Sequence, residues 1–558
     1  NAWFSGSKNL DTLLARRTLS QFSLSMQVDP ANRAFQAADY LVRHTRHNLF
    51  LTGRAGTGKT TFLRHLRETC PRKMAVVAPT GVAAINAGGM TIHSLFQIAP
   101  SVYPPNDRRL HPGTPSGPDK SNLFTHFRIS RERRKLIQEL EVLIFDEISM
   151  VRADLLDVVD VVLRHFGGRK HLPFGGKQVV FIGDAFQLPP VTTGEDWKLL
   201  KEHYDSPYFF SARSFQTAKP ELVELKKIYR QSDRRFINFL NRVRDDTLES
   251  AEIGRLNEEL VEAGFDYAAQ QYIYLATRNA VVRTKNKVEL DRLPTESRTY
   301  VARIEGKIEA REMPAPQELE LKVDAQVMFV KNDIGEERRY FNGKIGRVTA
   351  LTDVSVTVSC PPPPGAAPGE DGEPPEDKTI EVECVEWKKV RYYWDEEERE
   401  VREEILGVFR QFPLRLAWAI TVHKSQGLTF DRVYADLQGS FAAGQVYVAL
   451  SRCTALPGLK LATAIHRRDI RTDPRVVQFA NGFADDHHVE QLLAIAEFAA
   501  EAEQIDFLLE CGRPSDALRL LQELRDRYSY LPTELKECEE KIIAAVKLLE
   551  SGAPDHSL

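Results

Sequence analysis

The stretch G-R-A-G-T-G-K-T, from Gly53 to Thr60, constrains the fold of this chain more than any other feature of its sequence. It follows the apolar run N-L-F-L that begins at Asn48, and a helical pattern begins near Lys59. A glycine-rich turn between a buried strand and a helix is typical of a phosphate-binding loop, whose backbone N–H groups point at the anion. The segment therefore predicts a parallel α/β unit that binds a phosphorylated ligand.

The residues of this loop have distinct predicted roles. The backbone N–H groups of Ala55 to Lys59 would cradle phosphates, Lys59 would reach the β and γ oxygens, and Thr60 would ligate magnesium. A chance glycine-rich turn is the alternative, and the preceding strand argues against it. The predicted nucleotide contacts of the loop are Gly53, Ala55, Gly56, Thr57, Gly58, Lys59, Thr60 and Thr61.

Two later strand ends carry polar residues that suit nucleotide hydrolysis. The apolar run Val142 to Phe145 ends in Asp146 and Glu147, which predicts a magnesium-holding aspartate and a glutamate that orients the attacking water. An acidic helix cap would give the same letters, but a phosphate loop precedes them at domain distance. The next strand ends in G-D-A-F-Q-L-P-P, where Gln187 is placed to sense the γ-phosphate, unless the segment is an ordinary turn.

Two arginines suit the stabilisation of transition-state charge. They are Arg230 in I-Y-R-Q and Arg452 in A-L-S-R, both assigned to a second α/β lobe. Neither alone is more informative than a surface arginine. A nucleotide cleft between two lobes needs cations from its far side, however, and this requirement favours a catalytic role for both.

Short apolar runs outline two lobes of parallel strands. Met74 to Ala78 and Val179 to Ile182 complete the first lobe, which a Pro/Gly-rich stretch from Pro100 to Pro118 interrupts as an inserted loop or subdomain. A second α/β pattern begins around Leu222. Its predicted elements are a helix over Arg235 to Arg244 and strands over Ile273 to Ala276, Leu414 to Thr421 and Val433 to Leu437.

The second lobe is split by a segment of a different pattern. From Val301 to Gln411, Val, Thr and aromatic residues alternate, with N-G at Asn342 and Gly343, and this predicts a small β-barrel-like insertion. Its loop 361–377 has the composition of a chain that cannot pack a core. After about residue 485 the pattern becomes helical, which predicts helical hairpins that serve as an interaction module or as a packing extension.

Composition sets the class of protein. A chain of 558 residues is too long for one ordinary core, so several domains are expected. The apolar fraction is 42%, and no apolar run approaches the roughly 20 residues that span a bilayer. The 6 cysteines form no C-x-x-C pair. A soluble protein in a reducing compartment is therefore expected, without a disulfide scaffold, zinc ribbon or iron–sulfur cluster.

The net charge of -4 does not by itself favour a polyanionic partner, so any nucleic-acid contact must be local. One local excess of basic residues lies between Arg108 and Lys135. A nucleic-acid contact and a solvated helix face are equally open explanations for it. The basic residues are Arg108, Arg109, Lys120, Arg128, Arg131, Arg133, Arg134 and Lys135, against Asp119 and Glu132.

Taken together, the motifs resemble superfamily 1 helicases, specifically the Pif (petite integration frequency) family of 5′-to-3′ DNA helicases. They cover the chain from about Phe35 to about Asp473 in the family's order. The segment 154–168, in the place of the family's signature helix, carries fewer basic residues than the family pattern, and the helical tail lies outside the resemblance. The motifs are G-R-A-G-T-G-K-T, A-P-T-G-V-A-A-I-N-A-G-G-M-T-I-H-S-L-F, F-D-E-I-S-M, P-F-G-G-K-Q, G-D-A-F-Q-L-P-P, T-V-H-K-S-Q-G-L-T-F and Y-V-A-L-S-R.

The resemblance implies an α/β fold with two RecA-like parallel-sheet lobes. A small β-barrel, similar to a Src-homology barrel, is then inserted in the second lobe, and a C-terminal helical extension follows. The expected boundaries are 1–34 for an N-terminal tail, 35–210 for the first lobe with a wedge element at about 94–128, 211–300 and 411–484 for the second lobe, 301–410 for the insertion with its disordered loop 361–377, and 485–558 for the extension.

The resemblance also implies roles for residues that the chemistry alone does not assign. Gln36 in F-Q-A-A-D would contact the adenine, and Gly427 would contact the nucleotide. Apart from the resemblance, Phe96 is a candidate for stacking on a DNA base, although a core residue is the favoured alternative. The implied DNA contacts are Pro79, Thr80, Gly81, His93, Ser94, His423 and Lys424.

The implied activity is ATP- and Mg²⁺-dependent translocation, 5′-to-3′, on single-stranded DNA, with unwinding of duplexes and forks. G-quadruplexes and RNA–DNA hybrids are further expected substrates, and DNA repair, recombination and telomere maintenance are the expected processes. Bacterial cytoplasm is the first expectation for the compartment, with nucleus and mitochondrion left open. No membrane partner is expected, and the partner of the helical extension is unknown.

Two other functions compete with this prediction. The first is a nucleotide-gated clamp or translocase that displaces proteins without processive unwinding, and the intact Glu147, Arg230 and Arg452 count against it. The second is a RecD-type exonuclease subunit, which shares the phosphate loop and V-H-K-S-Q-G; the P-F-G-G stretch favours the Pif family instead.

Overall fold

The computed structural model describes residues 32–113, 122–127, 129–231, 233–310, 313–331, 333, 339–340, 342–362, 377–395, 400–440, 442–483 and 486–551. The chain divides into two compact units. The larger unit consists of the described residues of Arg46–Lys59 and Lys73–Asp485, and the smaller unit consists of those of Asn1–Thr45, Thr60–Arg72 and Asp486–Leu558.

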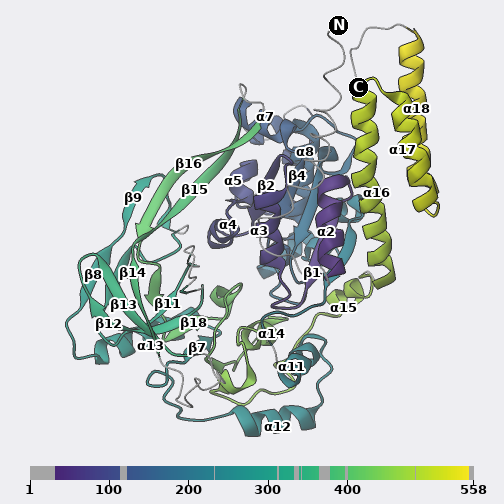
Figure 1. The fold of residues 1–558 in the computed structure, drawn as a ribbon. Coiled ribbons are helices and arrows are strands. Elements are labelled where there is room, and N and C mark those ends of the chain that lie inside the picture. Colours follow the sequence, from purple (N-terminus) through teal and green to yellow (C-terminus); the bar gives the residue numbers. More distant parts are fainter. Residues whose placement is uncertain are drawn as a thin grey trace, which may run out of the picture. The chain divides into compact units, whose positions relative to one another are not determined.

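A 6-stranded parallel sheet organises the first part of the larger unit, in the order β3-β2-β4-β5-β1-β6. Figure 1 labels its strands β1, β2 and β4. Its central strands are buried along almost their whole length, as parallel strands covered on both faces are. The strands expected from the apolar runs are confirmed within two residues at their ends. The bounds are β1 Leu49–Gly53, β2 Met74–Ala78, β3 Met90–Thr91, β4 Val142–Phe145, β5 Gln178–Ile182 and β6 Glu221–Leu225.

Strand β6 corrects one expectation. The α/β pattern around Leu222 was expected to open the second lobe, and this is wrong, because β6 pairs in parallel with β1 from Leu49↔Glu221 to Gly53↔Leu225. The sequence E-L-V-E-L gives a half-buried edge strand, whose pattern does not indicate which sheet it joins. The boundary between the lobes is accordingly proposed to lie after Leu225.

Helices and short 3₁₀ turns connect the strands of this first sheet. Helix α8 is confirmed where the sequence predicts a helix, and it buries Leu156, Val159 and Leu163 along one face. Of the predicted wedge at about 94–128, residues 114–121 and 128 lie outside the described part. The bounds are α4 Gly81–Ala87, α5 Ile92–Phe96, η1 Arg108–Leu110, α6 Leu123–His126, α7 Arg131–Glu139, η2 Ile148–Met150, α8 Ala153–Phe166, η3 Pro173–Gly176, α9 Gly194–Leu200, η4 Phe209–Ser211 and α10 Arg213–Ala218.

A second parallel sheet has 4 strands in the order β18-β7-β19-β20. The expected strand over 414–421 is two strands, since β17 joins an antiparallel sheet through β11 and only β18 joins this one. Ala417 lies between them, and its N–H donates to the carbonyl of Gln326. The bounds are β7 Ile273–Ala276, β17 Leu414–Leu416, β18 Ala419–Thr421, β19 Val433–Asp436, β20 Leu459–Leu461, α11 Arg234–Arg244, α12 Ser250–Leu260, α13 Asn279–Arg292, η6 His423–Ser425, α14 Gln445–Leu450, η7 Leu456–Gly458 and α15 Pro474–Ala480.

The insertion between β7 and β18 is made of antiparallel sheets, in the orders β14-β13-β12-β11-β17, β10-β8 and β15-β16-β9. The predicted turn at Asn342 and Gly343 is confirmed, and Gly343 has φ +99 where a Cβ would lie 2.2 Å from the carbonyl oxygen of Thr429. A closed barrel stays a prediction, and most of loop 361–377 lies outside the described residues. The bounds are β8 Arg298–Val301, β9 Arg303–Gly306, β10 Glu318–Leu321, β11 Gln326–Phe329, β12 Ile345–Leu351, β13 Ser355–Cys360, β14 Lys378–Glu383, β15 Val385–Asp395 and β16 Glu400–Gln411.

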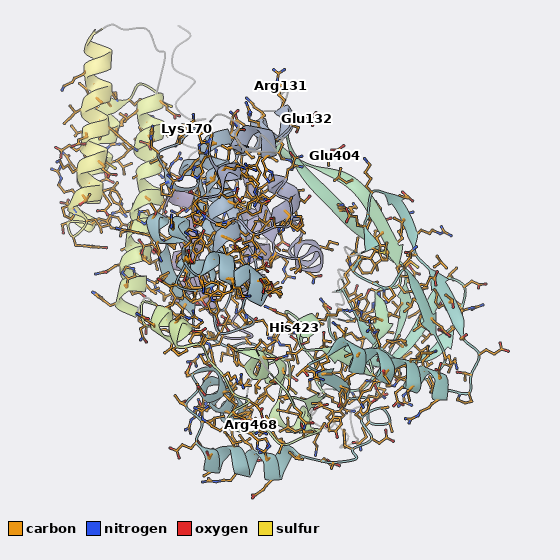
Figure 2. All side chains as sticks on the ribbon, turned by 180° about the vertical axis from the view of Figure 1, so that it is seen from behind. Arg131, Glu132, Lys170, Glu404, His423 and Arg468 are labelled. Atoms are coloured by element: carbon orange, nitrogen blue, oxygen red, sulfur yellow. The ribbon has the colours of Figure 1, made fainter. Side chains whose placement is uncertain are left out.

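Strands β15 and β16 form a long arm that reaches from the insertion to α7 (Figure 1). Figure 2 shows Arg131 and Glu132 of α7 at the same end of the larger unit as Glu404 of β16. Arg131 and Arg134 are exposed, and the guanidinium of Arg134 lies 5.2 Å from the ring centre of Phe166. Both explanations of the basic stretch, nucleic-acid contact and solvated helix face, therefore stay open.

The smaller unit joins two helices of the first lobe to the C-terminal helices. These are α2 Arg33–His44, α3 Lys59–Thr69 from its second residue on, α16 Asp486–Glu510, α17 Pro514–Arg527 and α18 Pro532–Ser551. The predicted helical extension is thereby confirmed as helical. Helix α16 packs along α2, with an ion pair of 2.8 Å between Arg33 and Glu490, while α16, α17 and α18 lie side by side around Phe498, Leu521 and Leu524 (Figure 1).

None of the helices in the described part of the chain is long and apolar enough to cross a bilayer. Every cysteine is a free thiol.

Candidate functional site

The phosphate loop follows β1 without a break, and its glycines adopt conformations that other residues avoid. Gly53, Gly56 and Gly58 have φ values of +155, +83 and +96. A Cβ on Gly56 would lie only 2.4 Å from the Cβ of Arg230, so the loop passes directly against that arginine. The loop is closed by the hydroxyl of Thr57, which donates to the carbonyl of Arg54 at 2.9 Å. Only glycine permits this tight curl beside another backbone.

The side chain of Lys59 is hydrogen-bonded to the backbone of the phosphate loop. Its ammonium donates to the carbonyl oxygens of Gly53 and Arg54, at 2.7 and 3.1 Å. Burial lowers the pKa of Lys59, while the carboxylates of Asp184 and Glu147 raise it. The amine therefore lies within electrostatic reach of two acidic residues.

The acidic pair predicted after β4 is in place. Burial, and then the neighbouring Glu147, raise the pKa of Asp146 to about 7. Glu147 itself has φ 52 and ψ 46, in the left-handed region that residues other than glycine seldom adopt. Backbone conformations of this kind persist where the surrounding structure imposes them, which happens often at functional sites.

A hydrogen-bonded chain links Glu147 to residues from both sheets. The side-chain nitrogen of Gln426, which follows η6, donates to Oε2 of Glu147 at 2.9 Å and to Oε1 of Gln187 at 3.3 Å. The amide of Gln187 in turn points at Asp184, at the long distance of 3.5 Å, and Arg244 pairs with Asp184 at 3.4 Å. The ends of β4 and β5 and the turn after β18 therefore meet at one place.

Arg230 and Arg452 lie in the same region. Arg452 is 2% exposed, and its guanidinium donates to backbone carbonyls that include those of Val448 and Leu428, at 2.8 and 3.2 Å. Burial, and then the charge of Arg452, lower the pKa of Arg230 to about 9. Among the described residues neither guanidinium forms an ion pair. Two desolvated cations without a carboxylate partner suit an anionic ligand.

The sequence matches a family model described as PIF1-like helicase over residues 29–253. It is also 31% identical to ATP-dependent DNA helicase Pif1 of Bdellovibrio bacteriovorus over 455 residues, which cover 80% of this chain and 91% of that protein. The chain belongs to the PIF1-like helicase family. The human relative, ATP-dependent DNA helicase PIF1, is 32% identical over 77% of this chain and only 60% of the longer human protein.

Solved structures of the family agree. Pif1 from Bacteroides sp in complex with ADP-AlF4 is 37% identical, with a TM-score of 0.70 and coverage of 82% of this chain and 97% of that chain. Bacteroides Pif1 bound to ssDNA superposes with a TM-score of 0.54 at the same identity and coverage. Membership in the PIF1-like helicase family confirms the predicted α/β class with RecA-like parallel sheets, and it confirms the enzyme class, an ATP-using DNA helicase.

The DNA contacts implied by the resemblance fall into two groups. Pro79, Thr80 and Gly81 follow β2, and His93 and Ser94 lie on α5 after β3. Because β2 and β3 pair in parallel, these two segments emerge side by side at one edge of the sheet. His423 and Lys424 form the other group, on η6 (Figure 2). Their roles as DNA contacts stay predictions.

The environment of the second group is cationic. Burial lowers the pKa of His423, and burial followed by the charges of Arg415 and Arg283 lowers that of Lys424. Three basic side chains from β17, α13 and η6 therefore lie within electrostatic reach of one another. Phe96, by contrast, is 0% exposed, which confirms the alternative of a core residue over a stacking role.

The remaining predicted nucleotide contacts are spread over both units. Gln36 lies on α2, where its side-chain oxygen accepts a hydrogen bond of 3.1 Å from Arg33. Thr60 and Thr61 are exposed in the first turn of α3. Gly427 has φ +78, and a Cβ there would lie 3.9 Å from Oε1 of Glu147. Of these residues, the structure brings Gly427 to the acidic pair.

The residues present fit a magnesium ion. Mg²⁺ in nucleotide sites takes one or two carboxylates, with phosphate oxygens and water completing the octahedron. Asp146 is such a carboxylate, and its raised pKa reports a buried acid that a nearby cation would stabilise. Within the described ranges no three His, Cys, Asp or Glu residues form a metal cluster.

Several residues of the site had no role predicted from the sequence. Gln426 and Tyr447 both stand inside motifs that carried the resemblance, H-K-S-Q-G and Y-V-A-L-S-R. The hydroxyl of Tyr447 accepts a hydrogen bond of 3.1 Å from the N–H of Ala55. Exposed Tyr229 lies against the loop too, since its N–H donates to the carbonyl of Gly56 at 2.9 Å. Only the fold shows which motif residues face the loop.

Gly56→Ala is expected to raise the KM for ATP about tenfold. The added methyl group meets the Cβ of Arg230 at 2.4 Å and forces alanine into the left-handed region, so the loop must move. A penalty of about 1.4 kcal/mol, at the lower end for such strain, corresponds to tenfold. Steady-state hydrolysis over a range of ATP concentrations measures it. Gly194→Ala, with nothing within 4 Å, is the control, and an unchanged KM in Gly56→Ala would contradict the placement of the loop.

Proposed function

We propose that this helicase hydrolyses ATP to move 5′-to-3′ along single-stranded DNA and to separate the strands of forks. The observation that carries the proposal is the meeting of the two sheets at Glu147. The carboxylate after β4 and the amide of Gln426 after β18 are 2.9 Å apart, so a hydrolytic residue of one lobe touches the segment of the other lobe that bears His423 and Lys424. The polarity rests on the family resemblance.

ATP would bind as the substrate on the phosphate loop. Backbone N–H groups at a helix start, together with Lys59, offer donors and positive charge to the phosphates. Arg230 and Arg452, which have no carboxylate partner among the described residues, would stabilise the charge that develops on the transferred phosphoryl group. Thr60 and Asp146 would hold Mg²⁺, which when bound neutralises negative charge on the phosphate oxygens.

Glu147 would orient the attacking water and accept its proton. A glutamate can do this when its carboxylate is free to accept a hydrogen bond from water. Gln187 would report the state of the phosphates, because its side chain contacts both Asp184 and Gln426. Changes at the nucleotide thereby reach η6 through side-chain contacts.

DNA would be gripped mainly by its phosphates. The groups at the ends of β2 and β3 and on η6 are hydroxyls, backbone N–H groups and basic side chains, which contact the sugar–phosphate backbone without reading sequence. Alternate grip and release of the two groups during the ATP cycle would move the protein along one strand. G-quadruplexes and RNA–DNA hybrids are proposed as further substrates on the resemblance alone.

Strand separation on tailed duplexes tests this proposal. With ATP and magnesium at a stated salt concentration, a duplex with a 5′ single-stranded tail is expected to open, and one with a 3′ tail is not. Opening of the 3′-tailed substrate alone would refute the polarity. DNA-stimulated hydrolysis without opening of either duplex would favour a protein-displacing translocase. Quadruplex and RNA–DNA substrates with the same 5′ tail test the wider range.

A further inference from the structure

We infer that Gln426 is a positioning residue that restrains Glu147 until DNA engages η6, so that it couples DNA contact to ATP hydrolysis. The inference rests on the proposed function and names the device that would make hydrolysis depend on DNA. It comes from three features of the structure: the contact between Gln426 and Glu147, the unsatisfied oxygen of the Gln426 amide, and the short turn that joins Gln426 to His423 and Lys424.

The contact is defined at atomic detail. The nitrogen of the Gln426 amide has two acceptors, Oε2 of Glu147 at 2.9 Å and Oε1 of Gln187 at 3.3 Å. Turning the amide over would place its oxygen against these two oxygens, so the hydrogen-bonding pattern fixes its orientation. A hydrogen bond to a carboxylate is stronger than one between neutral groups. It holds the Glu147 carboxylate toward Gln426 and uses one of the acceptor sites that water could otherwise bind.

The oxygen of the Gln426 amide indicates that the hydrogen bond between Gln426 and Glu147 can be broken. Oε1 of Gln426 is buried and has no hydrogen-bond partner among the described residues. A buried carbonyl oxygen without a donor costs free energy, roughly 1–3 kcal/mol. That cost offsets much of what the bond to Glu147 contributes. The restraint is therefore weak enough for a ligand on the same turn to reverse.

The turn η6 connects Gln426 to the predicted DNA contacts His423 and Lys424. η6 spans His423–Ser425, and the N–H of Gln426 donates to the carbonyl of His423 at 3.4 Å. Ser425 is 0% exposed, with its hydroxyl bonded to the carbonyl of Val422 at 2.7 Å. These backbone and hydroxyl contacts connect Gln426 to the turn that carries His423 and Lys424. A phosphate drawn to His423 or Lys424 would shift the amide of Gln426 with them.

Both oxygens of Glu147 face this turn. Gln426 bonds Oε2, and Gly427 approaches Oε1, from which a Cβ at that position would be 3.9 Å away. The backbone of Glu147 is in the left-handed region, which its surroundings must hold in place. The carboxylate is therefore released for water by rotation of its side chain as η6 moves away.

Gln426→Leu tests the inference, because leucine keeps the bulk and removes the donor. The DNA-free ATP hydrolysis rate is expected to rise about tenfold, a factor equal to about 1.4 kcal/mol, and the stimulation by single-stranded DNA to fall by the same factor. Gln426→Asn, which is one methylene shorter, should act in the same direction. DNA affinity, measured by fluorescence anisotropy, should not change, since His423 and Lys424 remain. Exposed Gln438→Leu is the matched control.

A double variant distinguishes a restraint of Glu147 by Gln426 from general damage to the site. Lys424→Ala alone should lose most of the DNA stimulation, whereas Lys424→Ala with Gln426→Leu should keep the raised DNA-free rate. DNA-free rates that stay level or fall in both Gln426 variants would overturn the inference and make Gln426 a residue that aligns Glu147 for catalysis. If the unaltered protein hydrolyses ATP without any response to DNA, the proposed function fails instead.

Discussion

Lys59→Ala is expected to abolish ATP turnover while single-stranded DNA binding stays close to that of the unaltered protein. The ammonium closes the loop through the carbonyls of Gly53 and Arg54, and it brings a positive charge to the loop that would hold the phosphates. Loss of one donor to a developing oxyanion lowers rates on the order of 100- to 1,000-fold. The loss of loop closure adds to this, so turnover should fall below detection in a phosphate-release assay.

The DNA measurement makes this result specific. The implied DNA contacts lie after β2, after β3 and on η6, and Lys59 belongs to none of these segments. Anisotropy with a labelled single strand should therefore give similar affinities for Lys59→Ala and for the unaltered protein. Lys201→Ala, at an exposed position after α9, controls for loss of a surface charge. Retained hydrolysis in Lys59→Ala would place the phosphate site elsewhere.

The sequence predicts most of the nucleotide side of this molecule, for a physical reason. A phosphate loop requires glycines at fixed positions between a strand and a helix. The local sequence is therefore sufficient to predict the loop. β1, β2, β4 and β5 are buried on both faces, and their continuous apolar runs reveal them. The acidic pair at Asp146 and Glu147 is found because it ends such a strand.

What the sequence does not predict depends on pairing between distant segments. β6 joins the first sheet through β1, far away in the chain, and its half-polar pattern does not indicate that choice. β17 and β18 lie in one largely apolar stretch of the sequence, 414–421, but belong to different sheets. Arg452 donates to the carbonyl of Val448 in the preceding helical turn and also to that of Leu428, which only the fold brings near. Its role in stabilising charge therefore stays a prediction.

Gln426 shows the same limit at the site. Its letter stands in H-K-S-Q-G, next to His423 and Lys424, and nothing in that motif indicates a partner more than two hundred residues earlier in the chain. The contact with Glu147 has a sequence separation of 279. A role for Gln426 becomes visible only when the end of β4 and the turn after β18 are seen together. The motif H-K-S-Q-G identifies the segment that reaches the site, and only the fold identifies Gln426 as the residue in it that contacts Glu147.

Glu147→Gln is expected to lower ATP hydrolysis roughly 1,000-fold while leaving ATP and DNA binding intact. The substitution keeps the size of the side chain and removes the group that accepts the proton, an effect worth 100- to 10,000-fold in typical enzymes. Single-turnover phosphate release measures the loss, and binding of a fluorescent ATP analogue measures what remains. Exposed Glu202→Gln controls for loss of a charge in the same lobe.

This variant also separates hydrolysis from substrate binding. Lys59→Ala and Glu147→Gln should both stop strand separation, but only Glu147→Gln should still show a DNA affinity that changes when ATP is added. Gln426→Leu, which acts on the same carboxylate, should shift the DNA-free rate in the opposite direction. A rate in Glu147→Gln above about one tenth of the unaltered value would mean that another group activates the water, because loss of the general base costs far more than tenfold. In that case the contact between Gln426 and Glu147 would lose its proposed part in the coupling.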